Sequence, residues 1–234
     1  MAKRQIHQPP KDPGKPECRE PYIVLESAHE SVAHLLSVFD EPRGEGRSRG
    51  APPNVEQDVL RAMVLLAGAG LDSTLKQLVS TALPKLVWTD KAVAKAVHKY
   101  LEARMDAQPE VLPEDDGWPH GKYLLALLFK RSPRQTFMND LTKRLAGRSL
   151  QSLRALEQTT DLFCLKLGDL GVSKEDIKDA IEVRNRIAHE MDVSFTRRAG
   201  QRHRRECRRE TMVKHANALL DVAGAILVEA AGKL

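Results

Sequence analysis

Arg184, Asn185 and His189 are the residues of this 234-residue chain whose types and spacing best fit a chemical site. The apolar residues around them recur at the three- and four-residue spacing of a helix, and Arg184 falls on the apolar side of that helix. A guanidinium cannot lose its charge, so at such a position it needs a carboxylate or phosphate partner to offset desolvation. From this helix alone, an arginine that is paired with a carboxylate and braces two helices explains the position equally well.

Asn185 and His189 are four residues apart and share one flank of the same helix, so the amide can orient the imidazole. Cleavage of RNA without a metal needs a group that carries protons near neutral pH and a fixed cation beside the crowded phosphate. In an ideal helix, however, Arg184 and His189 point about 140° apart. We therefore expect either that the helix bends or ends near Ala188, or that two copies of the protein build a composite site across a twofold axis.

The arginine-rich segment from Arg197 to Arg209 has seven arginines in thirteen residues. So many cations at the start of a helix would oppose its positive N-terminal dipole, and this cost indicates a partner for the charge. RNA phosphates or an acidic protein are the candidates, and a solvated basic loop is the alternative. Because only Phe195 lies nearby to stack on a base, base-specific recognition is not predicted. The expected RNA-binding residues are Arg202, Arg204, Arg205, Arg208 and Arg209.

The composition favours a single all-α domain. Hydrophobic residues make up 41% of the chain, which is enough for a core, and the apolar positions follow helical spacing with no convincing strand pattern. The net charge of +5 is too small to identify a nucleic-acid-binding protein by itself. The chain has an odd number of cysteines that lie far apart, namely Cys18, Cys164 and Cys207. This spacing argues against a disulfide framework and against a zinc site, and it indicates a reducing compartment.

The same patterns argue against several classes of protein. No phosphate-binding GxxxxGK[ST] loop is present, so we expect no nucleotide cofactor, and we expect no metal. No apolar run approaches the roughly 18 to 20 residues of a membrane span, and the proline-rich N-terminus lacks the apolar stretch of a secretory signal. We therefore expect a cytoplasmic protein without a membrane partner.

A proline-rich leader, residues 1–21, is expected to be flexible or to form an extended arm over a single domain of residues 22–234. The central core helix should run from about residue 55 to 83. Gly68 and Gly70 within it each cost about 1 kcal/mol relative to alanine. The close approach of another helix could offset this cost, and a local kink is the alternative explanation.

A helical and loop insertion is expected at about residues 84–147, with an acidic segment in its middle. Glu114, Asp115, Asp116 and His120 in that segment are more consistent with a solvated loop than with metal ligands. The other expected helices lie at about residues 23–39, 90–106, 120–130, 135–146, 149–167 and 211–231. One more helix is expected to begin after a cap at Ser173.

The sequence RNRIAH at residues 184–189 resembles the motif of the HEPN superfamily, in which an arginine, a polar residue and variable residues precede a histidine. Members of this superfamily are helical bundles, many of them metal-independent endoribonucleases of toxin and defence systems. The resemblance covers roughly residues 23–231 and implies that Arg184 and His189 are catalytic and that the site forms at a dimer interface, with Asn185 as the polar residue. In toxin members controlled by adenylylation a tyrosine lies two residues after the histidine, where this chain has Met191.

The function that these observations predict is metal-independent cleavage of RNA by a homodimer of HEPN-like helical bundles of the toxin or defence type. His189 is expected to act as general base or acid, Arg184 to stabilise the charged phosphorane, and Asn185 to position His189 or the phosphate. The basic segment supplies salt-sensitive attraction for RNA, and an antitoxin or sensor protein is an expected partner. The alternative is a non-catalytic helical RNA- or protein-binding module in which Arg184 is an ion-pair anchor.

Overall fold

Helices make up most of the structure, which confirms the all-α fold class. The computed structural model describes residues 4–41, 54–105, 127–149, 152–195 and 202–234. The elements in chain order are η1 (Pro16–Cys18), α1 (Arg19–Asp40), α2 (Asn54–Thr81), α3 (Leu83–Thr89), α4 (Lys91–Met105), α6 (Pro133–Ala146), α7 (Leu153–Leu162), η4 (Leu167–Asp169), α8 (Lys174–Glu190), β1 (Val193–Phe195), β2 (Arg202–Arg204) and α9 (Arg209–Gly232).

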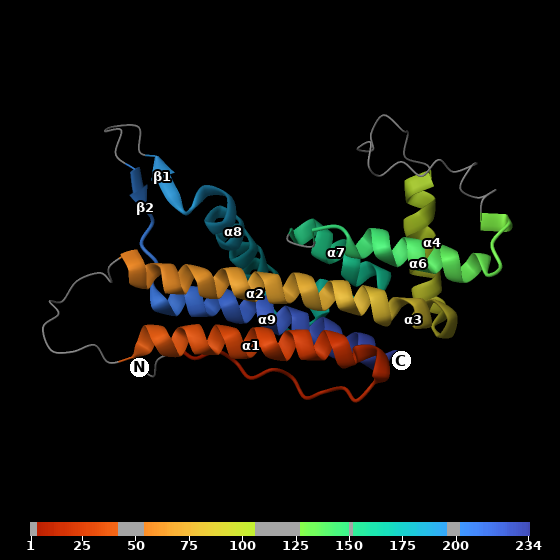
Figure 1. Cartoon of the computed structure of the whole chain (residues 1–234), viewed down its shortest axis with the longest axis horizontal. Coiled ribbons are helices and arrows are strands. Elements are labelled where there is room, and N and C mark those ends of the chain that lie inside the picture. Colours follow the sequence, from red (N-terminus) through yellow and green to blue (C-terminus); the bar gives the residue numbers. More distant parts are fainter. Residues whose placement is uncertain (1–3, 42–53, 106–126, 150–151, 196–201) are drawn as a thin grey trace, which may run out of the picture.

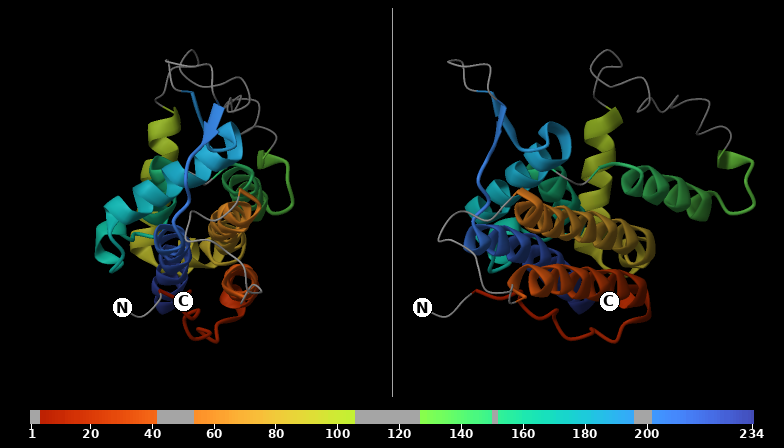
Figure 2. Two further views of the ribbon diagram at one scale, coloured as in Figure 1. Left: turned by 90° about the vertical axis from the view of Figure 1, so that its left-hand side faces the viewer. Right: turned by 60° about the vertical axis from the view of Figure 1, so that its left-hand side comes forward.

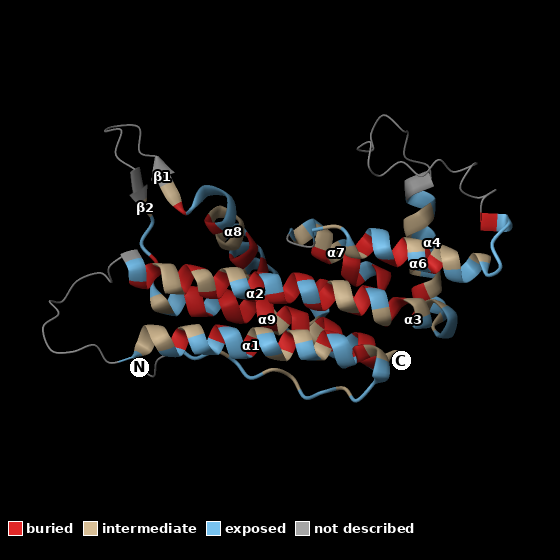
Figure 3. Ribbon diagram, in the orientation of Figure 1, coloured by how far each residue is buried: buried red, intermediate tan, exposed pale blue. Residues whose placement is uncertain are grey.

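Three long helices, α1, α2 and α9, run side by side and form the body of the molecule (Figure 1). Helix α2 packs against both of the others, and their buried faces are turned toward one another (Figure 3). Figure 2 shows the order of the layers, with α1 on one side, α2 and α9 in the middle and α8 on the other side. Helix α8 therefore rests on the two central helices. Buried side chains that fill this core include Leu25, Leu60, Met63, Leu71, Ile177, Leu220 and Leu227.

The two glycines of α2 mark places where another helix comes close. Helix α2 is continuous through both, so close approach rather than a kink explains them. A side chain at Gly70 would meet the Cβ atom of Ala28 in α1, and a side chain at Gly68 would meet the stem of Arg184 in α8. Because residues two apart in a helix point about 200° from each other, the two glycines admit neighbours on nearly opposite sides of α2.

The proline-rich leader lies along α9 from residue 4 onward. The backbone N–H of Arg4 donates to Glu210 and that of His7 donates to Asn217, at 3.0 Å in both cases. Further along, Pro10 lies against Gly224, where a Cβ atom would come within 3.1 Å of its ring. These residues form an extended arm over the domain, and α1 begins at Arg19 within the expected leader.

Helix α9 is a core helix that is buried along most of its length. It extends from Arg209 to Gly232, where residues 211–231 were expected. Among the described residues it is also the one helix that is long and apolar enough to cross a membrane by length and composition. The sequence had suggested no such segment. A buried core helix passes the same test, and 72% of the apolar window of α9 is buried inside the fold.

A short antiparallel ribbon, which the sequence did not predict, joins α8 to α9. Val193 pairs with Arg204 and Phe195 with Arg202. Helix α8 ends where Met191 and Asp192 both adopt left-handed backbone angles, with φ of 52° and 57°, and this turn directs the chain into β1. Strands of three residues are too short to give an alternating pattern, which explains why the sequence did not reveal them.

The expected insertion contains α3, α4 and α6. Helices α3 and α6 pack against α2, whereas α4 packs against α3 and α7. The predicted helices at 90–106 and 135–146 correspond to α4 and α6. The acidic segment with Glu114, Asp115, Asp116 and His120 lies outside the described residues, as does most of the helix expected at 120–130.

Candidate functional site

Helix α8 carries the predicted catalytic residues, and its N-terminus forms as the sequence predicts. The hydroxyl oxygen of Ser173 accepts a hydrogen bond from the backbone N–H of Asp176 at 3.3 Å, which caps the helix. Glu175 and Asp176 in the first turn favour the positive end of the helix dipole. Downstream, Ile177 and Ile181 are buried against the central helices, and they fix the face of α8 on which position 184 follows.

Arg184 is half-buried, and its stem passes over Gly68 of α2. A Cβ atom at residue 68 would lie 2.9 Å from Cγ of Arg184 and 3.3 Å from its Nε. The guanidinium donates one hydrogen bond, from Nη1 to the side-chain oxygen of Asn185 at 3.0 Å. Its Nε atom is buried and has no hydrogen-bond partner among the residues that the structure describes. The absence of a side chain at Gly68 is therefore what allows the arginine to lie in this position.

No carboxylate within the described part of the chain forms an ion pair with Arg184. Burial lowers the pKa of its guanidinium, and the charge of Asp72 partly opposes this shift. Asp72 itself is paired with Lys76 at 2.7 Å. The alternative explanation, a bracing arginine paired with a carboxylate, is therefore not what the described residues show. A half-buried cation keeps unused hydrogen-bonding capacity.

His189 lies exposed in the last turn of α8. Its ring makes no hydrogen bond or ion pair with any described residue, Arg184 included. Helix α8 continues unbroken through His189 and ends at Glu190, so no bend at Ala188 brings the arginine and the histidine together. The structure thus unites Arg184 with Asn185 but leaves His189 apart from Arg184 within one copy of the chain.

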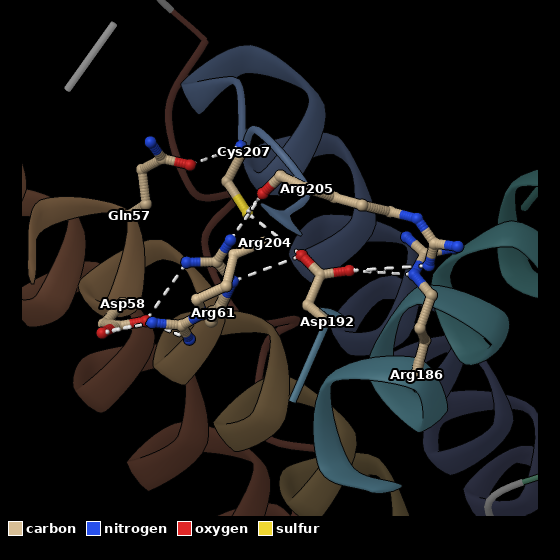
Figure 4. A network of polar contacts seen from close by, with 8 residues as sticks. All are labelled: Gln57, Asp58, Arg61, Arg186, Asp192, Arg204, Arg205 and Cys207. Carbon is tan, nitrogen blue, oxygen red and sulfur yellow. Dashed lines mark hydrogen bonds and ion pairs between the residues drawn. The ribbon is translucent and has the colours of Figure 1, made fainter. Parts of the chain in front are cut away.

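The C-terminal turn of α8 is anchored by a buried carboxylate, that of Asp192 (Figure 4). Asp192 is 2% exposed, and its two oxygens accept from Nε of Arg61 in α2 at 3.2 Å and from Nε of Arg186 in α8 at 2.9 Å. The backbone N–H of Arg205 donates to the carbonyl oxygen of Asp192 at 3.0 Å. The end of α8 that carries His189 is thereby tied both to α2 and to the segment that leads into α9.

The arginines of this segment that the structure describes differ in their partners: two bind a carboxylate through both of its oxygens, Arg205 lies 3.9 Å from Asp192, and Arg208 forms no ion pair. Arg204 binds both oxygens of Asp58, and Arg209 binds both oxygens of Asp40 from a side chain that is 11% exposed. These carboxylates raise the pKa of both guanidinium groups, and Arg204 in turn lowers the pKa of Asp58. Two of the five predicted RNA-binding arginines therefore hold the fold together, Arg204 by tying β2 to α2 and Arg209 by tying α9 to α1.

Of the remaining three predicted RNA-binding arginines, the structure describes the side chains of two. Arg205 and Arg208 are exposed, and Arg208 occupies the N-cap position of α9 without a capping hydrogen bond from its side chain. Arg202 lies in β2, and its side chain is outside the described part of the structure. The cost that so many cations would impose on the start of α9 is offset in part by Glu210 in its first turn, which is paired with Arg209 at 2.8 Å.

Arg61, Arg186 and Asp192 are residues of this region that the sequence analysis did not single out. Arg61 is 3% exposed and falls within the apolar stretch of α2, which is the same signal that identified Arg184. Asp192 gives no such signal, because it follows the end of the helix and its burial depends on a turn with two left-handed residues.

Comparison with known proteins identifies no matching family model, no matching curated protein and no matching solved structure.

Proposed function

We propose that this protein is a metal-independent endoribonuclease with a HEPN-like helical bundle, of the toxin or defence type, whose site is completed by a second copy of the chain. The observation that carries the proposal is Arg184, a half-buried guanidinium whose buried Nε has no partner in the described part of the chain. It lies one to two turns from the exposed His189 on the same helix. A phosphate group provides the anionic partner that the described residues do not supply to Arg184.

The chemistry follows from the residue types. His189 removes the proton from the 2′-hydroxyl, whose oxygen attacks the adjacent phosphorus, and the bond from phosphorus to the 5′-oxygen breaks. A histidine then returns a proton to the leaving 5′-oxygen. Arg184 stabilises the negative charge that develops on the phosphorane, and Asn185, which is hydrogen-bonded to it, fixes its orientation. The products carry a cyclic 2′,3′-phosphate and a 5′-hydroxyl.

A twofold arrangement of α8 explains how two groups that point apart act together. Ala188 and Met191 continue the stripe of Arg184 at four and seven residues' distance, and both are exposed, Met191 to 64%. A second copy of α8 packed on this stripe covers the apolar surface. It also brings the histidine of one copy toward the arginine of the other, so each dimer holds two composite sites.

The first test is incubation of the purified protein with mixed RNA in EDTA. Cleavage is expected with the wild type and not with His189→Ala or Arg184→Ala, and the products should carry cyclic phosphates. His98→Ala is the matched control, because His98 is exposed and belongs to α4, a helix that lies far from α8 (Figure 1). Robust cleavage that survives His189→Ala would contradict the mechanism.

A second test uses the two inactive variants together. If each site takes its arginine from one copy and its histidine from the other, a mixed dimer of Arg184→Ala and His189→Ala keeps one intact site. After subunit exchange, an equal mixture should recover about a quarter of wild-type activity, because half of the dimers are mixed and each has one of two sites. No recovery in mixed dimers would show that both residues act within one copy.

We further propose a cytoplasmic setting, with RNA and a second copy as partners and an antitoxin or sensor protein as controller. Expression of the wild type should then arrest its host, whereas the His189→Ala variant should not. The alternative function is a non-catalytic helical module that binds RNA or protein through its basic segment, for which the exposure of Arg205 and Arg208 is the supporting observation. A well-folded dimer that binds RNA without cleaving it would favour this alternative.

A further inference from the structure

Two guanidinium groups, those of Arg186 and Arg205, converge on a single carboxylate oxygen. Nε of Arg186 lies 2.9 Å from Oδ1 of Asp192, and Nη1 of Arg205 lies 3.9 Å from the same atom. The two arginine side chains are 32% and 43% exposed, whereas the side chain of Asp192 is 3% exposed. Figure 4 shows the two guanidinium groups next to each other at the end of α8. Like charges that meet in this way are stabilised by an anion that lies between them.

The carboxylates of the cluster are too few to neutralise it. The second oxygen of Asp192 accepts from Arg61, which also donates to Asp58 at 3.1 Å. The neighbouring Glu190 and Glu206 are exposed and form no ion pair with Arg186 or Arg205 among the described residues. The cluster therefore has two more positive than negative charges, with the cations Arg61, Arg186, Arg204 and Arg205 against the anions Asp58 and Asp192.

The excess charge is directed toward solvent by the way in which the arginines are held. Arg186 is bound to Asp192 through Nε, so its two Nη groups have no partner in the described structure. Arg205 is fixed at its backbone, where its N–H donates to Asp192 and its carbonyl oxygen accepts from Arg61. Both side chains are thus positioned by contacts that leave their hydrogen-bonding edges available, an arrangement suited to two-pronged binding of a phosphate.

We propose that Arg186 and Arg205 form a clamp for one backbone phosphate of single-stranded RNA, beside the phosphate that is cleaved. Arg186 precedes His189 by three residues, so the two lie on adjacent turns of α8 about 5–6 Å apart at their Cβ atoms. The clamp contacts phosphate and no base, and it therefore binds independently of sequence. This inference rests on the proposed ribonuclease function and adds a substrate-binding subsite to it.

The test measures binding in a background that cannot cleave. Fluorescence anisotropy of a labelled twelve-nucleotide RNA is recorded with His189→Ala protein and with the double variant His189→Ala, Arg205→Ala, between 50 and 200 mM salt. Loss of the clamp is expected to weaken binding at least tenfold at the lowest salt and to reduce the slope of log K against log salt by about 0.7 for the lost phosphate contact. The RNA affinity of the Arg205→Lys variant should lie between those of the parent and the Arg205→Ala variant, because lysine keeps the positive charge but lacks the forked guanidinium group.

The matched control is Arg154→Ala, which removes an exposed arginine of α7 that makes no hydrogen bond or ion pair within the described residues. Its binding and salt slope should equal those of the His189→Ala parent. Because Arg186→Ala would also deprive a buried carboxylate of a partner, Arg186→Lys is used instead. If both side chains bind the same phosphate, Arg205→Ala should weaken RNA binding by a smaller factor in the Arg186→Lys background than in the parent.

The outcomes separate the clamp from the ribonuclease function. Unchanged affinity and salt slope in the Arg205→Ala variant, or no RNA binding by the parent at 50 mM salt, overturns the clamp. Cleavage by the wild type together with unchanged binding by Arg205→Ala rejects the clamp alone. Weakened binding by Arg205→Ala without cleavage by the wild type rejects the ribonuclease and keeps the phosphate subsite. A preference for an acidic peptide over RNA would assign the pair to a protein partner.

Discussion

Gly68 offers a way to displace the proposed catalytic arginine without altering the arginine itself. In the variant Gly68→Ala, the new Cβ atom would lie 2.9 Å from Cγ of Arg184, whereas ordinary van der Waals contact begins at 3.4 Å. The stem has to move by about 0.5 Å, which equals the tolerance within which catalytic groups are held. Because a misplacement of 1 Å can cost about 100-fold in rate, we expect cleavage to fall roughly tenfold.

The same variant should fold normally. Alanine in the middle of α2 raises helix propensity by about 1 kcal/mol relative to glycine. The atoms that it meets belong to a flexible side chain, which can yield at little cost. We therefore expect the free energy of unfolding of Gly68→Ala, measured by urea denaturation, to stay within about 1 kcal/mol of the wild type.

Gly70→Ala is the matched control, because it makes the same change in the same helix but faces α1. Its Cβ atom would collide with the Cβ atom of Ala28, which is rigidly attached to the backbone, so α1 and α2 have to separate. Overpacking of this kind costs about 1–3 kcal/mol. We expect Gly70→Ala to lower the free energy of unfolding and to leave the activity per folded dimer unchanged.

The two variants together can refute the reasoning. A folded, dimeric Gly68→Ala protein that cleaves RNA at the wild-type rate would show that the position of Arg184 over α2 does not matter for activity. A loss of cleavage in Gly70→Ala as large as that in Gly68→Ala, at equal folded concentration, would show that the effect comes from the bundle as a whole.

Two further predictions concern titration and thiol chemistry. Burial lowers the pKa of His29, whose Nδ1 donates to the carbonyl oxygen of His7. Below about pH 6.5 the unfolded chain therefore takes up a proton at this histidine more readily than the folded chain does. The free energy of unfolding should thus decrease as the pH is lowered. The loss of unfolding free energy in urea between pH 7.5 and 5.5 should be smaller in His29→Asn; an equal loss would contradict this. Burial raises the pKa of Cys18 and Cys207 to about 11, whereas Cys164 is exposed, so a thiol reagent at pH 8 should label one cysteine quickly and all three after unfolding. Rapid labelling of Cys207 in the native protein would contradict its burial.

The sequence predicted the long helices well and the contacts between distant segments poorly. The apolar spacing of the central helix predicted residues 55–83, and α2 runs from Asn54 to Thr81, because a helix packed on several sides repeats its pattern over many turns. The role of Arg209 could not be predicted in the same way. It pairs with Asp40, which is 169 residues away in the chain, and no local pattern encodes such a pair.

The candidate site shows the same limit. The sequence placed Arg184 on the apolar side of its helix, and the structure has it half-buried over Gly68, although nothing in the sequence joined these two positions. The sequence also suggested that the helix could end near Ala188, whereas it continues to Glu190. The anchor at Asp192 depends on a left-handed turn that non-glycine residues seldom adopt, so it could be recognised only in three dimensions.

The way in which α8 is attached to α2 limits how the chain can change in evolution. Two contacts attach α8 and the turn that follows it to α2, one where Arg184 lies over Gly68 and one where Asp192 meets Arg61. These two contact residues of α2 are seven positions apart, or about 10.5 Å along the helix. One residue inserted between them would rotate one contact by about 100° relative to the other, and α8 could then keep only one of its two attachments. Insertions and deletions should therefore be tolerated in the loops of this protein and excluded from the stretch of α2 between Arg61 and Gly68.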